Sequence, residues 1–214
     1  MFRKRVKMGK EITYREYIVS DYQYLIDIMD KAWGYSQFYS EKLGNLMAEH
    51  DLLERLALCT FSCVALDGER PVGFFLGRRM DGICNVTYAE HAREVLDAMK
   101  PNLGAPVYAL INSRIKEIND DLVRESGKSF DAEAQILVVD KDYIGQGIGQ
   151  AMLQNFKDYL VEQGLNTYYA CTDTDSYFEF CESNGFTRCG SKKFGIPFVK
   201  KTQVDLFLYG ASVN

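Results

Sequence analysis

The sequence predicts an α/β (α+β) fold with a mixed, mostly antiparallel sheet of about seven strands and helices on both faces. Two β-type runs flank an Asp-Gly turn at 67–68, which predicts an antiparallel hairpin. Further on, a strand, a glycine loop and a helix precede another strand, and this order predicts a parallel pair with a right-handed crossover. The seven predicted strands are 11–18, 58–66, 71–79, 134–139, 166–172, 187–194 and 203–209.

Composition limits the class of protein. With 214 residues and a 47% apolar fraction, we expect one domain over 1–214 with one substantial core. The net charge is −5 and most basic residues are scattered, so no nucleic-acid groove is expected, and the acidic balance slightly favours a cationic amine as partner.

The six cysteines come without a signal peptide, which predicts reduced thiols in the cytoplasm. No C-x-x-C occurs and both histidines are far from the cysteines in sequence, so we expect no metal site. No apolar stretch approaches membrane-spanning length, and no membrane partner is expected.

The N-terminal third predicts a strand followed by two helices. Ser20 and Gln23 form a capping box for a helix that ends at Gly34, and apolar residues at helical spacing continue over 37–57. His50 within this second helix is expected to pack in the core or at its edge. Cys59 and Cys63 are expected on one face of the next strand, as small hydrophobic residues.

Residues 81–130 form a long connection that predicts two helices. Thr87 and Glu90 offer a capping box for the first helix, and Pro101 and Gly104 separate the two apolar stripes. The start of the second stripe, 107–111, is also compatible with a short strand. Inserted segments of this length are usually functional or disordered, and the stripes favour order.

The glycine loop is the strongest functional signal. Gly145, Gly147 and Gly149 alternate with Ile and Gln between a strand and a helix start, where backbone N–H groups and the helix dipole favour a phosphate or pyrophosphate. A dinucleotide-binding G-x-G-x-x-G fails because Gln150 and Met152 stand at its third glycine, and no Gly-Lys-Ser/Thr closes a P-loop. The alternative is a structural turn that caps an ordinary helix.

This loop resembles the coenzyme A loop of the GNAT superfamily of acyl-CoA-dependent N-acyltransferases, whose signature is Arg/Gln-x-x-Gly-x-Gly/Ala. Gly147 and Gly149 match the signature, whereas Ile144 stands in place of Arg or Gln. The resemblance implies that 144–149 hold the pyrophosphate and that the preceding strand binds the pantetheine arm. The implied cofactor contacts are Leu137, Val138, Val139, Ile144, Gly145, Gln146, Gly147, Ile148, Gly149 and Thr174.

A second segment also resembles this family. Its chains often carry Asn-x-x-Ala-x-x-x-Tyr-x-x-x-Gly-Phe, a short helix before a strand, and here Gly185 and Phe186 keep that spacing. Thr174, Tyr177 and Cys181 occupy the Asn, Ala and Tyr positions. On a helix these three positions would share one face, directed at the cofactor.

Acyl transfer to an amine needs a base, an oxyanion-stabilising group and an acid for the departing thiolate. The resemblance implies Glu133 as a base acting through water, a main-chain N–H near Val139 for the oxyanion, and Cys181 or Tyr177 as the acid. The alternatives are a solvated carboxylate for Glu133 and ordinary helix packing for the other two.

We therefore expect an N-acetyltransferase that moves an acetyl group from acetyl-CoA to a primary amine, by direct attack in a ternary complex without a metal. The 81–130 insertion is interpreted as a wall or lid of the acceptor site, with a homodimerisation element as an equal alternative. A rival hypothesis is an acyl-CoA-binding module without transferase activity. A third, less favoured, is a helical-insertion dimer whose loop binds another phosphate ligand.

Overall fold

The computed structural model describes residues 11–195 and 203–213. In chain order the elements are β1 (Ile12–Arg15), the 3-10 helix η1 (Val19–Asp21), α1 (Tyr22–Trp33), α2 (Tyr35–Phe38), α3 (Glu41–Leu58), β2 (Phe61–Asp67), β3 (Arg70–Arg79), α4 (Val86–Met99), α5 (Ala105–Glu125), β4 (Ala132–Val139), the 3-10 helix η2 (Lys141–Tyr143), α6 (Ile148–Glu162), β5 (Thr167–Asp173), α7 (Glu179–Ser183), β6 (Thr187–Gly195) and β7 (Gln203–Ser212). Residues 196–202, which connect the sixth and seventh predicted strands, lie outside the described residues.

The seven strands form one sheet in the order β1-β2-β3-β4-β5-β7-β6. Every neighbouring pair is antiparallel except β4 and β5, which are parallel. The predicted mixed, mostly antiparallel sheet is therefore confirmed. The helical insertion between the third and fourth strands is confirmed too, as α4 and α5.

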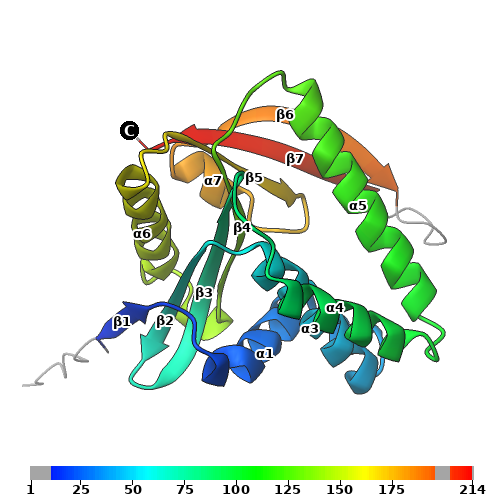
Figure 1. Ribbon diagram of the computed structural model, residues 1–214. Helices are drawn as coiled ribbons and strands as arrows, with labels where there is room; N and C mark the ends of the chain where they lie inside the picture. Colours follow the sequence, from blue (N-terminus) through cyan, green and yellow to red (C-terminus); the bar gives the residue numbers. More distant parts are fainter. Residues whose placement is uncertain (1–10, 196–202, 214) are drawn as a thin grey trace, which may run out of the picture.

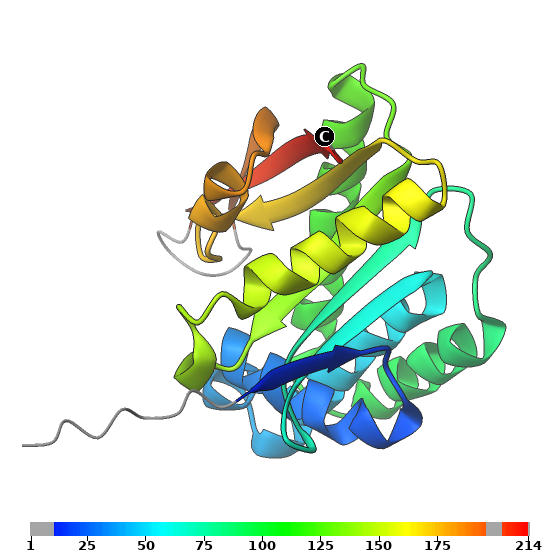
Figure 2. The same ribbon diagram turned by 90° about the vertical axis from the view of Figure 1, so that its left-hand side faces the viewer.

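Helices cover both faces of the sheet (Figures 1 and 2). On one face, Met152, Phe156 and Leu160 of α6 are buried with residues of β2, β3 and β5. On the other face, α1 and α3 pack on β2, β3 and β4. The long helix α5 runs from α4 to the β6–β7 end of the sheet, where Ile118 and Leu122 pack against β7 (Figure 1).

The parallel pair separates almost at once. Only Ala132 and Glu133 of β4 pair with β5, at Tyr168 and Tyr169. From there β5 continues beside β7 as far as Asp173, whereas β4 continues beside β3 alone. The edge of β4 beyond Glu133 therefore has no strand partner on its β5 side.

Several predicted boundaries were wrong, and at the start of α4 the cause is a side chain that binds backbone N–H groups. Asp21, rather than Ser20, precedes α1, and its carboxylate accepts from the N–H of Ile18. Asn85, rather than Thr87, caps α4. The alternative of a strand over 107–111 is excluded because this stretch is helical, and Cys59 follows α3 rather than lying in β2 with Cys63.

We predict that Phe156→Ala lowers the free energy of unfolding by about 3–5 kcal/mol, because its fully buried ring packs between Phe61, Phe75 and Tyr168 and its loss leaves a cavity. Urea denaturation monitored by circular dichroism measures the change. Val161→Ala on the same helix is the control, because Val161 is 59% exposed and should cost less than about 0.5 kcal/mol. Equal costs for the two variants would contradict this packing.

Candidate functional site

The glycine loop is fixed to the β2–β3 hairpin at its start. The N–H of Asp140 donates to the carbonyl of Val72 at 2.8 Å, and its carboxylate pairs with Arg70 at 3.3 Å. The hydroxyl of Tyr143 donates to the carboxylate of Asp67 at 2.5 Å. The loop therefore begins from a fixed position at the end of β4.

Two glycines shape the loop itself. Gly145 and Gly147 both have φ of +80°, a conformation that disfavours residues with a Cβ. The backbone N–H groups of residues 145–150 donate to no acceptor within the described chain. They lie at the N-terminus of α6, a 15-residue helix whose dipole adds positive potential. The arrangement fits a pyrophosphate, which presents several anionic oxygens to such donors.

The strand that leads to this loop presents an unpaired edge. The side chains of Leu137 and Val139 pack towards α6, and Val138 packs towards α1 and α3. All three lie beyond the last residue pair with β5. Gln135 sits at a bulge opposite β3, and its Oε1 is buried with no hydrogen-bond partner in the described structure. The edge can therefore hydrogen-bond an extended ligand.

Helix α7 lies close to the loop and to β4. A Cβ added at Gly149 would meet the ring of Phe180 at 3.1 Å and Leu137 at 3.4 Å. Cys181 is buried, and burial raises the pKa of its thiol to about 11, with the charge of Glu182 adding to this rise. The thiol is therefore protonated at neutral pH.

The predicted common helical face of Thr174, Tyr177 and Cys181 was wrong. Helix α7 begins only at Glu179, because the carboxylate of Asp173 accepts from the N–H groups of Asp175 and Ser176 and forms a turn there. Thr174 instead forms two hydrogen bonds with Asp205 of β7: its N–H donates to the carbonyl of Asp205, and its hydroxyl oxygen accepts from the N–H of Asp205. Tyr177 is 72% exposed in this turn, and Ile144 in the glycine loop is 66% exposed.

Glu133 lies where β4 and β5 separate. Its side chain is 19% exposed and accepts a hydrogen bond from Nε of Arg78 at 2.5 Å. Burial and the charges of Glu133 and Asp120 raise the pKa of Cys171 on β5. The sequence placed Glu133 at the start of the strand but gave no indication of its pairing with Arg78.

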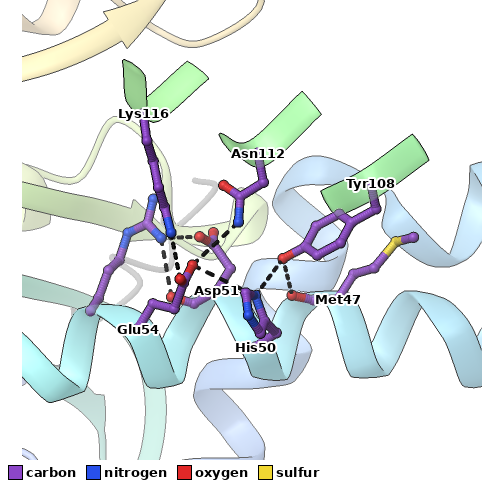
Figure 3. A network of polar contacts seen from close by, with 8 residues as sticks. Met47, His50, Asp51, Glu54, Tyr108, Asn112 and Lys116 are labelled. Atoms are coloured by element: carbon purple, nitrogen blue, oxygen red, sulfur yellow. Dashed lines mark hydrogen bonds and ion pairs between the residues drawn. The ribbon is translucent and has the colours of Figure 1, made fainter. Parts of the chain in front are cut away.

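A network of polar side chains between α3 and α5 was missed by the sequence analysis (Figure 3). Nδ1 of His50 lies 3.0 Å from the hydroxyl of Tyr108, which also donates to the carbonyl of Met47 at 3.3 Å. Glu54 accepts from Asn112 at 3.2 Å and from Lys116.

The charge states of this network follow from its surroundings. Burial lowers the pKa of His50. Burial alone would raise the pKa of Glu54, but hydrogen bonds from Lys116 and Asn112 and the positive charge of Lys116 hold it below its ordinary value. A neutral His50 beside an ionised Glu54 is therefore expected at neutral pH. The available sequence signal was the four-residue spacing of polar residues on both helices.

Other features of the described chain set limits on the site. No group of three or more His, Cys, Asp or Glu side chains in the described ranges could hold a metal ion. Within the same ranges, no helix combines the length and the apolarity needed to cross a bilayer. A surface pocket of about 410 Å³ lies between β2 and α6, lined by Ser62, Asn155 and Tyr159 among others, and it contains no residue of the glycine loop.

Comparison with known proteins identifies related folds. Residues 22–186 match the model of the acetyltransferase (GNAT) family. No curated protein matches the chain significantly. Solved structures do match, at identities that establish similarity of fold alone.

One of these structures is the PaiA N-acetyltransferase from Thermoplasma acidophilum in complex with coenzyme A, with 13% identity, a TM-score of 0.53, and coverage of 94% of this chain and 99% of that one. A protein named SsHAT has 15% identity and a TM-score of 0.65, with 95% and 98% covered. Arylalkylamine N-acetyltransferase 2 from Aedes aegypti has 17% identity and a TM-score of 0.59, with 95% and 99% covered.

We predict that the stability of the protein falls as the pH drops through about 6.5, the ordinary pKa of histidine, in part because of His50. Because folding lowers the pKa of His50, the unfolded chain binds a proton at a higher pH than the folded chain does, and protonation therefore favours unfolding. The loss of stability stops growing once the pH is below the lowered pKa of the folded state. The pH dependence of the urea midpoint measures this effect. His50→Gln should flatten the curve between pH 7 and 5.5, and His91→Gln is the control; an unchanged slope in His50→Gln would contradict the account.

Proposed function

The chain belongs to the acetyltransferase (GNAT) family, and we propose that it transfers an acetyl group from acetyl-CoA to a primary amine by direct attack in a ternary complex. The observation that carries this proposal is the set of N–H groups of residues 145–150, which have no acceptor in the described chain and lie at the start of α6. A pyrophosphate supplies the oxygens that these donors lack. The separation of β4 and β5 supports a place for the pantetheine arm beside residues 137–139.

The acetyl-transfer step needs a donor for the oxyanion, a base for the amine and an acid for the thiolate, and different residues supply each of them. The amine nitrogen attacks the thioester carbon, a main-chain N–H near Val139 stabilises the oxyanion, and the C–S bond then breaks. Glu133 accepts the proton of the amine through a water molecule, with Arg78 holding its carboxylate in place. Cys181 is the favoured acid for the departing thiolate because its thiol is protonated at neutral pH, and Tyr177 is the alternative donor.

We assign α5 of the insertion to the wall of the acceptor site. It faces α3 across the polar network and contacts the β6–β7 end of the sheet, so it spans the side of the molecule opposite α6 (Figure 1). The alternative role, a homodimer contact, would use its exposed surface. We also propose a cytoplasmic location, because none of the six cysteines forms a disulfide and thiols stay reduced in the cytoplasm.

A second candidate is an acyl-CoA-binding module without transferase activity. Two departures from the family pattern favour it: Ile144 at the usual Arg or Gln position, and Cys181 at the usual Tyr position. Cofactor binding is common to both candidates. Only the enzyme would release free CoA in the presence of an amine.

We predict that the protein binds acetyl-CoA with micromolar affinity and that Gly147→Glu abolishes binding, because a carboxylate would then occupy the anion site. Isothermal titration calorimetry measures the affinity. Gly164→Glu is the matched control, because Gly164 also has positive φ and open space around it but lies after the other end of α6. Absence of binding by the unmodified protein, or equal loss in both variants, would contradict the site.

We predict that Glu133→Gln lowers kcat by about 100-fold, the order expected for loss of a general base, with little change in acetyl-CoA affinity. A thiol-release assay with acetyl-CoA and an amine that the enzyme acetylates gives kcat, and its pH profile should lose the limb that rises with the ionisation of the base. Glu162→Gln, at the exposed end of α6, serves as the control. If Glu133→Gln stays within about twofold of the unmodified enzyme, Glu133 is not the base.

A further inference from the structure

Arg55 on α3 has one edge of its guanidinium group fixed and the other unused. Its Nη1 donates to the backbone carbonyl of Asp51 at 3.1 Å and also to the Asp51 carboxylate. Its Nε is buried and has no hydrogen-bond partner in the described structure, and its Nη2 donates to no described residue. The side chain is nonetheless 27% accessible. The Nε–Nη2 edge is therefore oriented by Asp51 but not saturated by the protein.

That edge has a chemical preference. Nε–H and Nη2–H point in parallel and match the two oxygens of one carboxylate, which they bind in a bidentate manner. Buried donors in native proteins almost always have a partner, so an unpaired Nε–H indicates a ligand or ordered water. A lysine could supply the charge but not this pair of parallel donors.

Arg55 belongs to the same electrostatic environment as the proposed base. Burial alone would lower the pKa of its guanidinium, whereas the carboxylates of Asp51 and Glu133 raise it. Glu133 pairs with Tyr169 at the last β4–β5 residue pair, and its charge and that of Asp120 of α5 both raise the pKa of Cys171 on β5. A carboxylate on Arg55 would therefore lie on the Glu133 side of the sheet.

Three ion pairs lie near this point. Asp51 pairs with Arg55, Glu54 with Lys116, and Glu133 with Arg78. A substrate that carries both an ammonium and a carboxylate would add no net charge to this cluster. On α5, Asn119 lies seven residues after Asn112 and hence on the same face, and its Oδ1 is also buried without a partner in the described chain. That oxygen could accept from the ammonium.

We propose that the acceptor is a primary amine that also carries a carboxylate, as an amino acid does, and that the Nε–Nη2 edge of Arg55 binds this carboxylate. Arg55 is then a specificity-determining residue of the acceptor site. This inference rests on the acetyl transfer proposed above.

The test compares matched acceptors on the full-length protein. L-phenylalanine is paired with 2-phenylethylamine and L-methionine with 3-(methylthio)propylamine, from which only the α-carboxylate has been removed. Thiol release from acetyl-CoA gives kcat/KM for each compound. Arg55→Lys retains a positive charge beside Asp51 and removes the two parallel N–H donors of the Nε–Nη2 edge. Arg124→Lys, at an exposed ion pair on α5, is the control. Thermal melting verifies that both variants fold.

We expect at least one amino acid to exceed its decarboxylated partner by about tenfold or more. Arg55→Lys should lower kcat/KM for that amino acid by about 10- to 100-fold, mainly through KM, and leave its decarboxylated partner within about threefold. Equal or better turnover of the decarboxylated amines, or an unchanged preference in Arg55→Lys, would overturn this inference while leaving acetyl transfer intact. Acetyl-CoA binding without turnover of any pair would overturn acetyl transfer and this inference with it.

Discussion

The separation of β4 from β5 after two residue pairs is the constraint on which the rest of the site depends. Strand β5 turns to β7, so β4 keeps one unpaired edge that runs directly into the glycine loop. Unpaired backbone groups are costly to bury, and a ligand that hydrogen-bonds them compensates for this cost. The same separation leaves Glu133 at the last paired position, with Arg78 from β3 neutralising its charge. The unpaired edge, the proposed anion site that it leads into and the proposed base thus depend on the same separation of strands.

Helix α5 of the insertion contacts the β5–β7–β6 part of the sheet on one side and α3 on the other. The C-terminal half of α5 packs through Ile118 and Leu122 on the β5–β7 part, and Lys192 of β6 pairs with Asp121 and Glu125. Its middle reaches α3 through Asn112 and Lys116, both bonded to Glu54 (Figure 3). Apolar packing fixes its position on one side, and directional polar contacts define its register on the other. A helix fixed in this way holds its side chains in a defined geometry, as the proposed role in the acceptor site requires.

The sequence predicted features that depend on local patterns. The Asp-Gly turn specified the β2–β3 hairpin, and the alternating glycines located the loop at the start of α6. Prediction from local patterns was wrong where one side chain binds nearby backbone N–H groups and forms a turn in place of a helix, as Asp173 does before α7. It could not find contacts between residues distant in the chain, such as His50 with Tyr108 or Arg78 with Glu133, because these depend on helix packing and strand register. The open edge of Arg55 was also invisible, since an unpaired donor is recognised only when every neighbour is known.

The most direct test of the central claim is a titration of the isotopically labelled protein with coenzyme A, followed by amide chemical shifts. If the loop and the unpaired edge of β4 form the cofactor site, the amides of residues 137–139 and 145–150 should show the largest changes, with the N–H signals of the loop moving as they gain anionic acceptors. Changes confined to the pocket between β2 and α6, around Asn155 and Tyr159, would contradict the account. Absence of changes at saturating coenzyme A would contradict it equally.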